Sequence, residues 1–132
     1  MYRRYCRTAT LVFLAFTVYP VFVKLIGHRL AHDWAHSALH FASALLAAYA
    51  GWLASDLVAR LFTVGVAVLY GILGVVGWFV QGFFLDAPFA IPLGPVDNVF
   101  HLLLAAGALA AIALSRRDRL PSERREQPAT TF

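Results

Sequence analysis

The chain alternates between long apolar segments and short polar links. Four segments are long, apolar and almost free of charge: residues 8–26, 33–54, 61–85 and 97–115. A helix of about 20 such residues crosses the ~30 Å of hydrocarbon in a bilayer. The pattern therefore predicts an all-α, polytopic membrane protein, with four transmembrane helices in an antiparallel bundle.

Composition excludes the soluble classes. Hydrophobic residues make up 61% of the 132 residues, charged residues only 14%, and the mean hydropathy is +0.70. Soluble domains carry about 25% charged residues, so this chain cannot cover itself with a polar surface. We expect one transmembrane domain over residues 1–115. Residues 116–132 are basic, lack apolar periodicity and are predicted to form a disordered tail.

The basic residues are distributed unevenly over the links. Only Lys24 and Arg29 fall on one side of the predicted bundle, and the others fall on the opposite side: Arg3, Arg4, Arg7, Arg60, Arg116, Arg117, Arg119, Arg124 and Arg125. Arginine and lysine mark the cytoplasmic side, so both termini are predicted to be cytoplasmic. Because the charge serves as a topology signal, we expect the bilayer as partner and no nucleic acid. The Ala-, Leu-, Val- and Gly-rich composition indicates a bacterial protein of the inner membrane.

The first segment is predicted to be a retained helix. It is too long for the apolar region of a signal peptide, and no Ala-x-Ala cleavage site follows it. Pro20 lacks a backbone N–H, so a kink or an end of regular helix is expected there. Cys6 is the only cysteine, which excludes an intrachain disulfide and a cysteine-based metal cage.

Small residues recur along the second and third segments and predict close helix packing, within the chain or in a homo-oligomer or larger membrane complex. They are Ser43, Ala47 and Gly51, and Gly71, Gly74 and Gly77. Residues 10–20 also resemble residues 63–71, and each stretch leads into a helix with His near its start. This weak similarity indicates either a two-fold internal repeat of helix pairs or the chance likeness of apolar segments.

Two short polar clusters stand at the start of otherwise apolar segments. Residues 36–40 read His-Ser-Ala-Leu-His, and residues 97–101 read Asp-Asn-Val-Phe-His. Side chains four residues apart lie on one face of a helix, so each cluster presents two ligand-type groups to one side. Both clusters start at the outer face, where ionisable groups turn inward toward partners. We therefore expect one shared site between the second and fourth helices, formed by His36, His40, Asp97 and His101.

Two neighbouring polar residues are assigned structural roles. Asp33 is predicted to cap the second helix, and Asn98 is predicted to hold the loop before the fourth. His28 and His32 continue the four-residue spacing, but the row drifts around the helix with each step, so they are expected at the surface.

These residues resemble a family of small four-helix bacterial membrane proteins catalogued as domain of unknown function 4383. The resemblance extends over residues 8–115 and is carried by three segments: 36–40, 69–77 and 95–104. The family has His-Asn-x-x-His on the second helix and Asp-Asn-x-x-His-Leu on the fourth, and here Ser37 replaces the first Asn. The resemblance implies the four-helix fold and supplies no activity.

Several functions are compatible with the polar cluster. Its side chains can bond one another and knit two helices together, which predicts a non-enzymatic structural or accessory membrane protein. Three imidazoles and a carboxylate can instead bind a transition metal, and two histidines can bind haem, as in a redox-type membrane protein. A quinone site and a proton or solute path, as in a small transporter subunit, are further alternatives. No nucleophile–base pair, phosphate loop or Cys-x-x-Cys motif predicts an enzyme.

Overall fold

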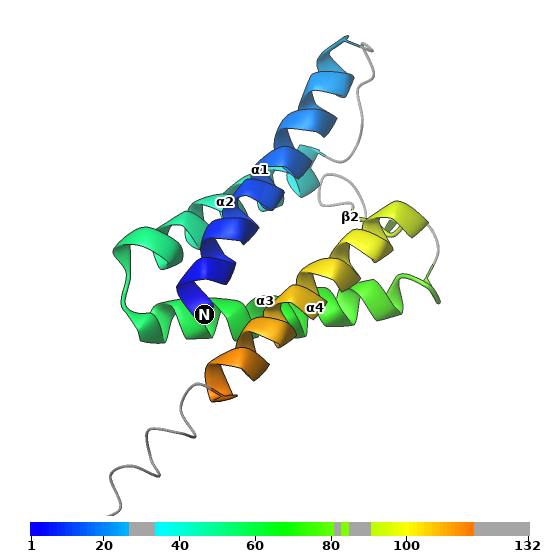
Figure 1. Cartoon of the computed structure of the whole chain (residues 1–132). Coiled ribbons are helices and arrows are strands. Elements are labelled where there is room, and N and C mark those ends of the chain that lie inside the picture. Colours follow the sequence, from blue (N-terminus) through cyan, green and yellow to red (C-terminus); the bar gives the residue numbers. More distant parts are fainter. Residues whose placement is uncertain (27–33, 81–82, 85–90, 118–132) are drawn as a thin grey trace, which may run out of the picture.

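The computed structural model describes residues 1–26, 34–80, 83–84 and 91–117. Over these residues the fold is helical, apart from one pair of short antiparallel strands with two residues in each strand (Figure 1). The elements are α1 (Tyr2–Ile26), α2 (Trp34–Ala48), the π-helix η1 (Tyr49–Leu53), α3 (Asp56–Val76), β1 (Phe83–Phe84), β2 (Ile91–Pro92) and α4 (Pro95–Arg117). Residues 118–132, most of the predicted tail, lie outside the described part.

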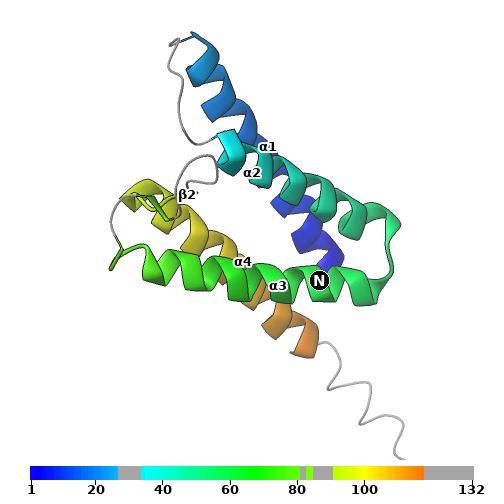
Figure 2. The same cartoon turned by 180° about the vertical axis from the view of Figure 1, so that it is seen from behind.

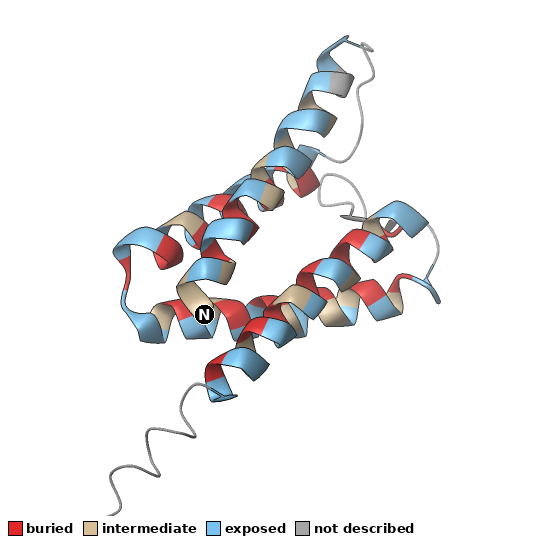
Figure 3. Ribbon diagram, viewed as in Figure 1, coloured by how far each residue is buried: buried red, intermediate tan, exposed pale blue. Residues whose placement is uncertain are grey.

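Three of the described helices are long and apolar enough to cross a membrane: Tyr2–Phe22 within α1, Asp56–Val76 and Pro95–Arg117. The second predicted segment differs from expectation, because its α-helical part has only 15 residues before the chain enters η1. Many of the exposed residues of the helices, which Figure 3 colours pale blue, are large and apolar. Leu11, Leu53 and Leu103 are each at least two-thirds exposed.

The helices form two closely packed pairs, α1 with α2 and α3 with α4 (Figures 1 and 2). Both views place the N-terminus, the α2–α3 link and the end of α4 at one end of the molecule. The starts of α2 and α4, which carry the histidines, lie at the other end. Buried side chains from all four helices meet between the pairs, among them Phe13, Ala47, Tyr70 and Leu104.

Glycines on α3 allow α4 to pack close to its backbone. A Cβ on Gly71 would lie 3.8 Å from the Cβ of Ala105, and a Cβ on Gly74 only 3.0 Å from the backbone nitrogen of Leu102. A Cβ on Gly77 would overlap the side chain of Asn98. The predicted glycine stripe is thus the contact face of α3, and van der Waals packing of this kind drives helix association in lipid.

The π-helix η1 lies where the end of α2 approaches the start of α1. A Cβ on Gly51 would lie 3.1 Å from the backbone nitrogen of Arg7, and Nε of Arg7 donates to the Gly51 carbonyl at 3.0 Å. Arg3 donates to the carbonyl of Ala54 and forms an ion pair with Asp56. Helix ends and π-turns leave carbonyls without regular partners, and the two arginines satisfy these.

The bounds of α3 differ from the predicted ones for local reasons. The helix α3 begins at Asp56 rather than Leu61, because Ser55 caps it by accepting a hydrogen bond from the N–H of Val58. It ends at Val76, before the close contact between Gly77 and α4. Pro20 does not end α1, which continues to Ile26.

The contact between α3 and α4 can be tested on one helix. Gly74→Ala should lower the thermal stability of the detergent-solubilised protein by about 1–3 kcal/mol, because the new methyl group meets the backbone of α4. Gly65→Ala is the matched control: in the described part of the chain, no atom beyond its own helical backbone lies within 4 Å of the added Cβ, and alanine favours the helix. Equal melting temperatures for the two variants would contradict the close contact.

Candidate functional site

Three histidines from two helices converge in the interior. His36 and His40 lie one turn apart on α2, with ring centroids 4.3 Å apart, and His101 reaches them from α4. One ring nitrogen from each residue lies within 4.8 Å of the other two. The three side chains are 8%, 4% and 1% exposed, respectively. The structure thus brings together three of the four residues predicted for the shared site, which we call the three-histidine cluster.

The cluster is buried because both helices turn a single face inward. On α2 the buried residues repeat at helical spacing: His36, Ser37, His40, Ala44 and Ala47. On α4 the buried face carries His101 together with Phe100, Leu104 and Ala108. In each case the histidines occupy the first turns of the inward face, and small or apolar residues continue it.

His40 is oriented by a carbonyl that a proline has released. Pro20 has no N–H, so the carbonyl of Phe16, four residues earlier on α1, loses its helical donor. Nδ1 of His40 lies 3.4 Å from that carbonyl oxygen and is hydrogen-bonded to it. A carbonyl can only accept, so the hydrogen lies on Nδ1 and the neutral ring carries its lone pair on Nε2. Metal-binding histidines are commonly held in one tautomer by such a bond.

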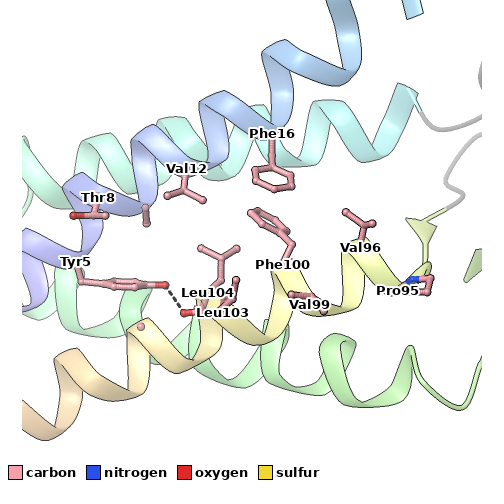
Figure 4. A pocket seen from close by; sticks show the side chains of 12 residues that line it. Tyr5, Thr8, Val12, Phe16, Pro95, Val96, Val99, Phe100, Leu103 and Leu104 are labelled. Atoms are coloured by element: carbon pink, nitrogen blue, oxygen red, sulfur yellow. Dashed lines mark hydrogen bonds between the residues drawn. The ribbon is translucent and has the colours of Figure 1, made fainter. Parts of the chain in front are cut away.

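Aromatic rings enclose the cluster on the side of α1. The ring of Phe100 packs against His40 at 5.4 Å between centroids, and Phe16 stacks on Phe100 at 3.7 Å. Figure 4 shows these two rings facing one another across a groove between α1 and α4, in which the Tyr5 hydroxyl donates to the Leu104 carbonyl. The groove is apolar, has a volume of about 680 Å³ and does not include the histidines.

His101 lies against Tyr70 of α3, with 5.3 Å between their ring centroids. Nδ1 of His101 has no hydrogen-bond partner among the described residues. Tyr70 and Ser43 of α2 line the same small cavity beside the cluster. His40 and His101 therefore each lie against a neighbour that sequence reasoning had not assigned to the site. Of these neighbours, only the Phe16 carbonyl could have been identified from the sequence, because a proline at position 20 leaves the carbonyl four residues earlier without its helical donor.

The predicted fourth ligand, Asp97, does not belong to the cluster. It is the third residue of α4, and side chains of a helix lean toward its N-terminus. Its carboxylate accordingly lies over Gly94, 3.4 Å from where a Cβ on that glycine would be. There its negative charge complements the positive end of the helix dipole.

Of the two polar residues predicted to have structural roles, Asn98 lies in the described part of the chain and Asp33 does not. The side-chain Nδ2 of Asn98 donates to the carbonyl of Leu93 at 3.5 Å, which holds the turn before α4 as expected. Asp33 lies outside the described residues, as do His28 and His32.

A cavity of about 200 Å³ adjoins the cluster between α2 and α3. Pockets that hold drug-sized ligands measure about 300–1,000 Å³, so this space is small for a haem. The cluster offers three neutral nitrogen donors, which suit zinc, iron, cobalt, nickel and copper.

No protein-family model, no curated protein and no solved structure matches this chain. The resemblance to the four-helix family therefore stays a prediction. A fold by itself does not determine function, so the chemistry of the site has to carry the functional argument.

The orientation of His40 gives a test of its own. Pro20→Ala supplies an N–H to the Phe16 carbonyl, which then competes with Nδ1 of His40. Nitrogen NMR of imidazole-labelled protein should show the Nδ1–H tautomer of His40 in the parent chain and lose that preference in the variant. Pro95→Ala is the control. Because Pro95 is the first residue of α4, it deprives no carbonyl inside a helix of its donor, and its replacement should leave the tautomer of His40 unchanged. An unchanged His40 in Pro20→Ala would contradict this account.

Proposed function

We propose that this chain is a small, non-enzymatic integral membrane protein whose three-histidine cluster binds one divalent transition-metal ion. The convergence of three buried ring nitrogens within 4.8 Å carries this proposal. Tetrahedral zinc at 2.0–2.1 Å from each nitrogen requires nitrogens roughly 3.3 Å apart, so small side-chain rotations complete the site. In such a site the ion joins α2 of one helix pair to α4 of the other.

The membrane arrangement is part of the same proposal. The chain would lie in the bacterial inner membrane as an antiparallel bundle, with α2 and η1 together forming the fourth span. The N-terminus and the end of α4 lie at one end of the molecule with the α2–α3 link, and the arginines of these segments would mark it as cytoplasmic (Figure 1). The histidines would then lie toward the outer face.

Reporter fusions can test this topology. A periplasmic reporter fused after Pro92 should be active, and the same reporter fused after Phe132 should be inactive, because the two positions would lie on opposite sides. A cytoplasmic reporter should give the inverse pattern at the same two positions. Equal activity at both positions would contradict the arrangement.

Metal content is the direct test of the cluster. Protein purified in mild detergent and dialysed against zinc should retain about one equivalent, and His40→Ala and His101→Ala should lose it. At a zinc concentration of 100 times Kd, the ion should stabilise the parent chain by about 2.7 kcal/mol. Removal of the ion with a chelator should therefore lower its melting temperature and leave that of His101→Ala unchanged.

Asp97→Asn tests whether the carboxylate of Asp97 is one of the metal ligands. It removes the carboxylate that the sequence predicts as a ligand and keeps the three imidazoles, so it should retain the metal. Loss of metal in Asp97→Asn would place the carboxylate in the site. His28→Ala should have no effect, because that residue is predicted to lie at the surface.

A metal-free packing role is the second candidate, favoured by the hydrogen bond of His40 to the Phe16 carbonyl. This bond links α1 and α2 without any ion. In that case His40→Ala would still lower the melting temperature, but the parent chain would retain no zinc and would not respond to the chelator. The two measurements together separate the candidates.

A further inference from the structure

The three-histidine cluster leaves a coordination position open. Structural zinc sites have four protein ligands, whereas sites with three protein ligands keep the fourth position for water or a small molecule. In the described part of the chain, no fourth His, Cys, Asp or Glu belongs to the group. An ion held here would therefore have one position available to an external ligand.

The adjoining cavity provides the space for that ligand. All three histidines line it, and its volume of about 200 Å³ holds several waters or one small molecule, since a water occupies about 30 Å³. Ser43 and Tyr70 contribute two hydroxyls to its lining. Three leucines complete the lining: Leu39, Leu69 and Leu73.

The walls of the cavity select the kind of molecule that can enter. Leu39 and Leu69 are 50% and 56% exposed, so this side of the cavity faces hydrocarbon when the helices span a bilayer. Transfer of an ion through that region is costly, whereas small uncharged molecules dissolve in it. The opposite side is closed by the ring of Phe100, which packs against His40.

We propose that the metal-loaded cluster binds a small, neutral, lipid-soluble molecule of the size of a diatomic gas. The molecule enters between α2 and α3 and donates a lone pair to the open coordination position, in reversible coordination that needs no external oxidant or reductant. This inference rests on the proposed metal site. It adds the class of ligand and the route by which that ligand arrives.

The test uses the full chain in lipid nanodiscs, loaded with iron(II) without oxygen, and nitric oxide as the probe. Iron content is measured first. Nitric oxide should then give the half-integer-spin electron paramagnetic resonance signal of a non-haem iron–nitrosyl complex. Leu69→Trp, which fills the cavity from α3, should retain iron and weaken nitric oxide binding by about tenfold or more.

Two further variants make the assignment specific. Leu39→Trp fills the same cavity from α2 and should act like Leu69→Trp. Leu103→Trp is the matched control, because Leu103 is 68% exposed and lines the separate groove between α1 and α4. It should bind nitric oxide like the parent chain.

The outcomes separate the two proposals. A parent chain that binds no iron or other metal overturns the metal site itself. Bound iron without a nitrosyl signal overturns only the open position, because the protein then fills all coordination positions. A signal that Leu39→Trp and Leu69→Trp leave unchanged, or that Leu103→Trp weakens equally, overturns the cavity as the binding space.

Discussion

The absence of water in a bilayer requires every polar group of a spanning segment to find its partner inside the protein. This chain, in which three helices are long and apolar enough to cross a membrane, has such partners at two irregular places. At Pro20 the freed carbonyl of Phe16 is satisfied by His40 from the neighbouring helix. At η1 the carbonyls of Gly51 and Ala54 are satisfied by arginines of α1. Both irregularities therefore strengthen the link between α1 and the segment formed by α2 and η1.

The same constraint explains why the histidines lie where they do. Glycines on α3 bring α4 close, and this contact turns the face with Phe100 and His101 toward the first helix pair. The imidazoles then meet at the starts of α2 and α4, in the interior. Three polar rings in so apolar a place require one another, a hydroxyl or an ion as partner. A metal ion would satisfy them together and tie the helix pairs at the end opposite Arg3 and Arg7.

Much of the fold could be predicted from the pattern of the sequence. The apolar segments, the glycine face of α3 and the inward position of the three histidines follow from length and four-residue spacing. The repeat of helix pairs and the arrangement in a membrane stay predictions. The start of α3 could not be placed from hydropathy, because Asp56 and Arg60 interrupt the apolar pattern there and the Ser55 cap determines where the helix begins. Likewise, hydropathy cannot distinguish the π-turn of η1 from an α-helix.

The sequence by itself determined the helical class of the fold and the residue types available for a site, because hydrophobicity and spacing are properties of the chain alone. Tertiary structure decided which of those residues meet. It placed His36, His40 and His101 together and turned Asp97 toward Gly94, since helix rotation and side-chain direction depend on packing between helices. It also assigned the freed carbonyl of Phe16 to His40 and left a cavity beside the rings. Both features lie between residues distant in sequence, where spacing along one helix carries no information.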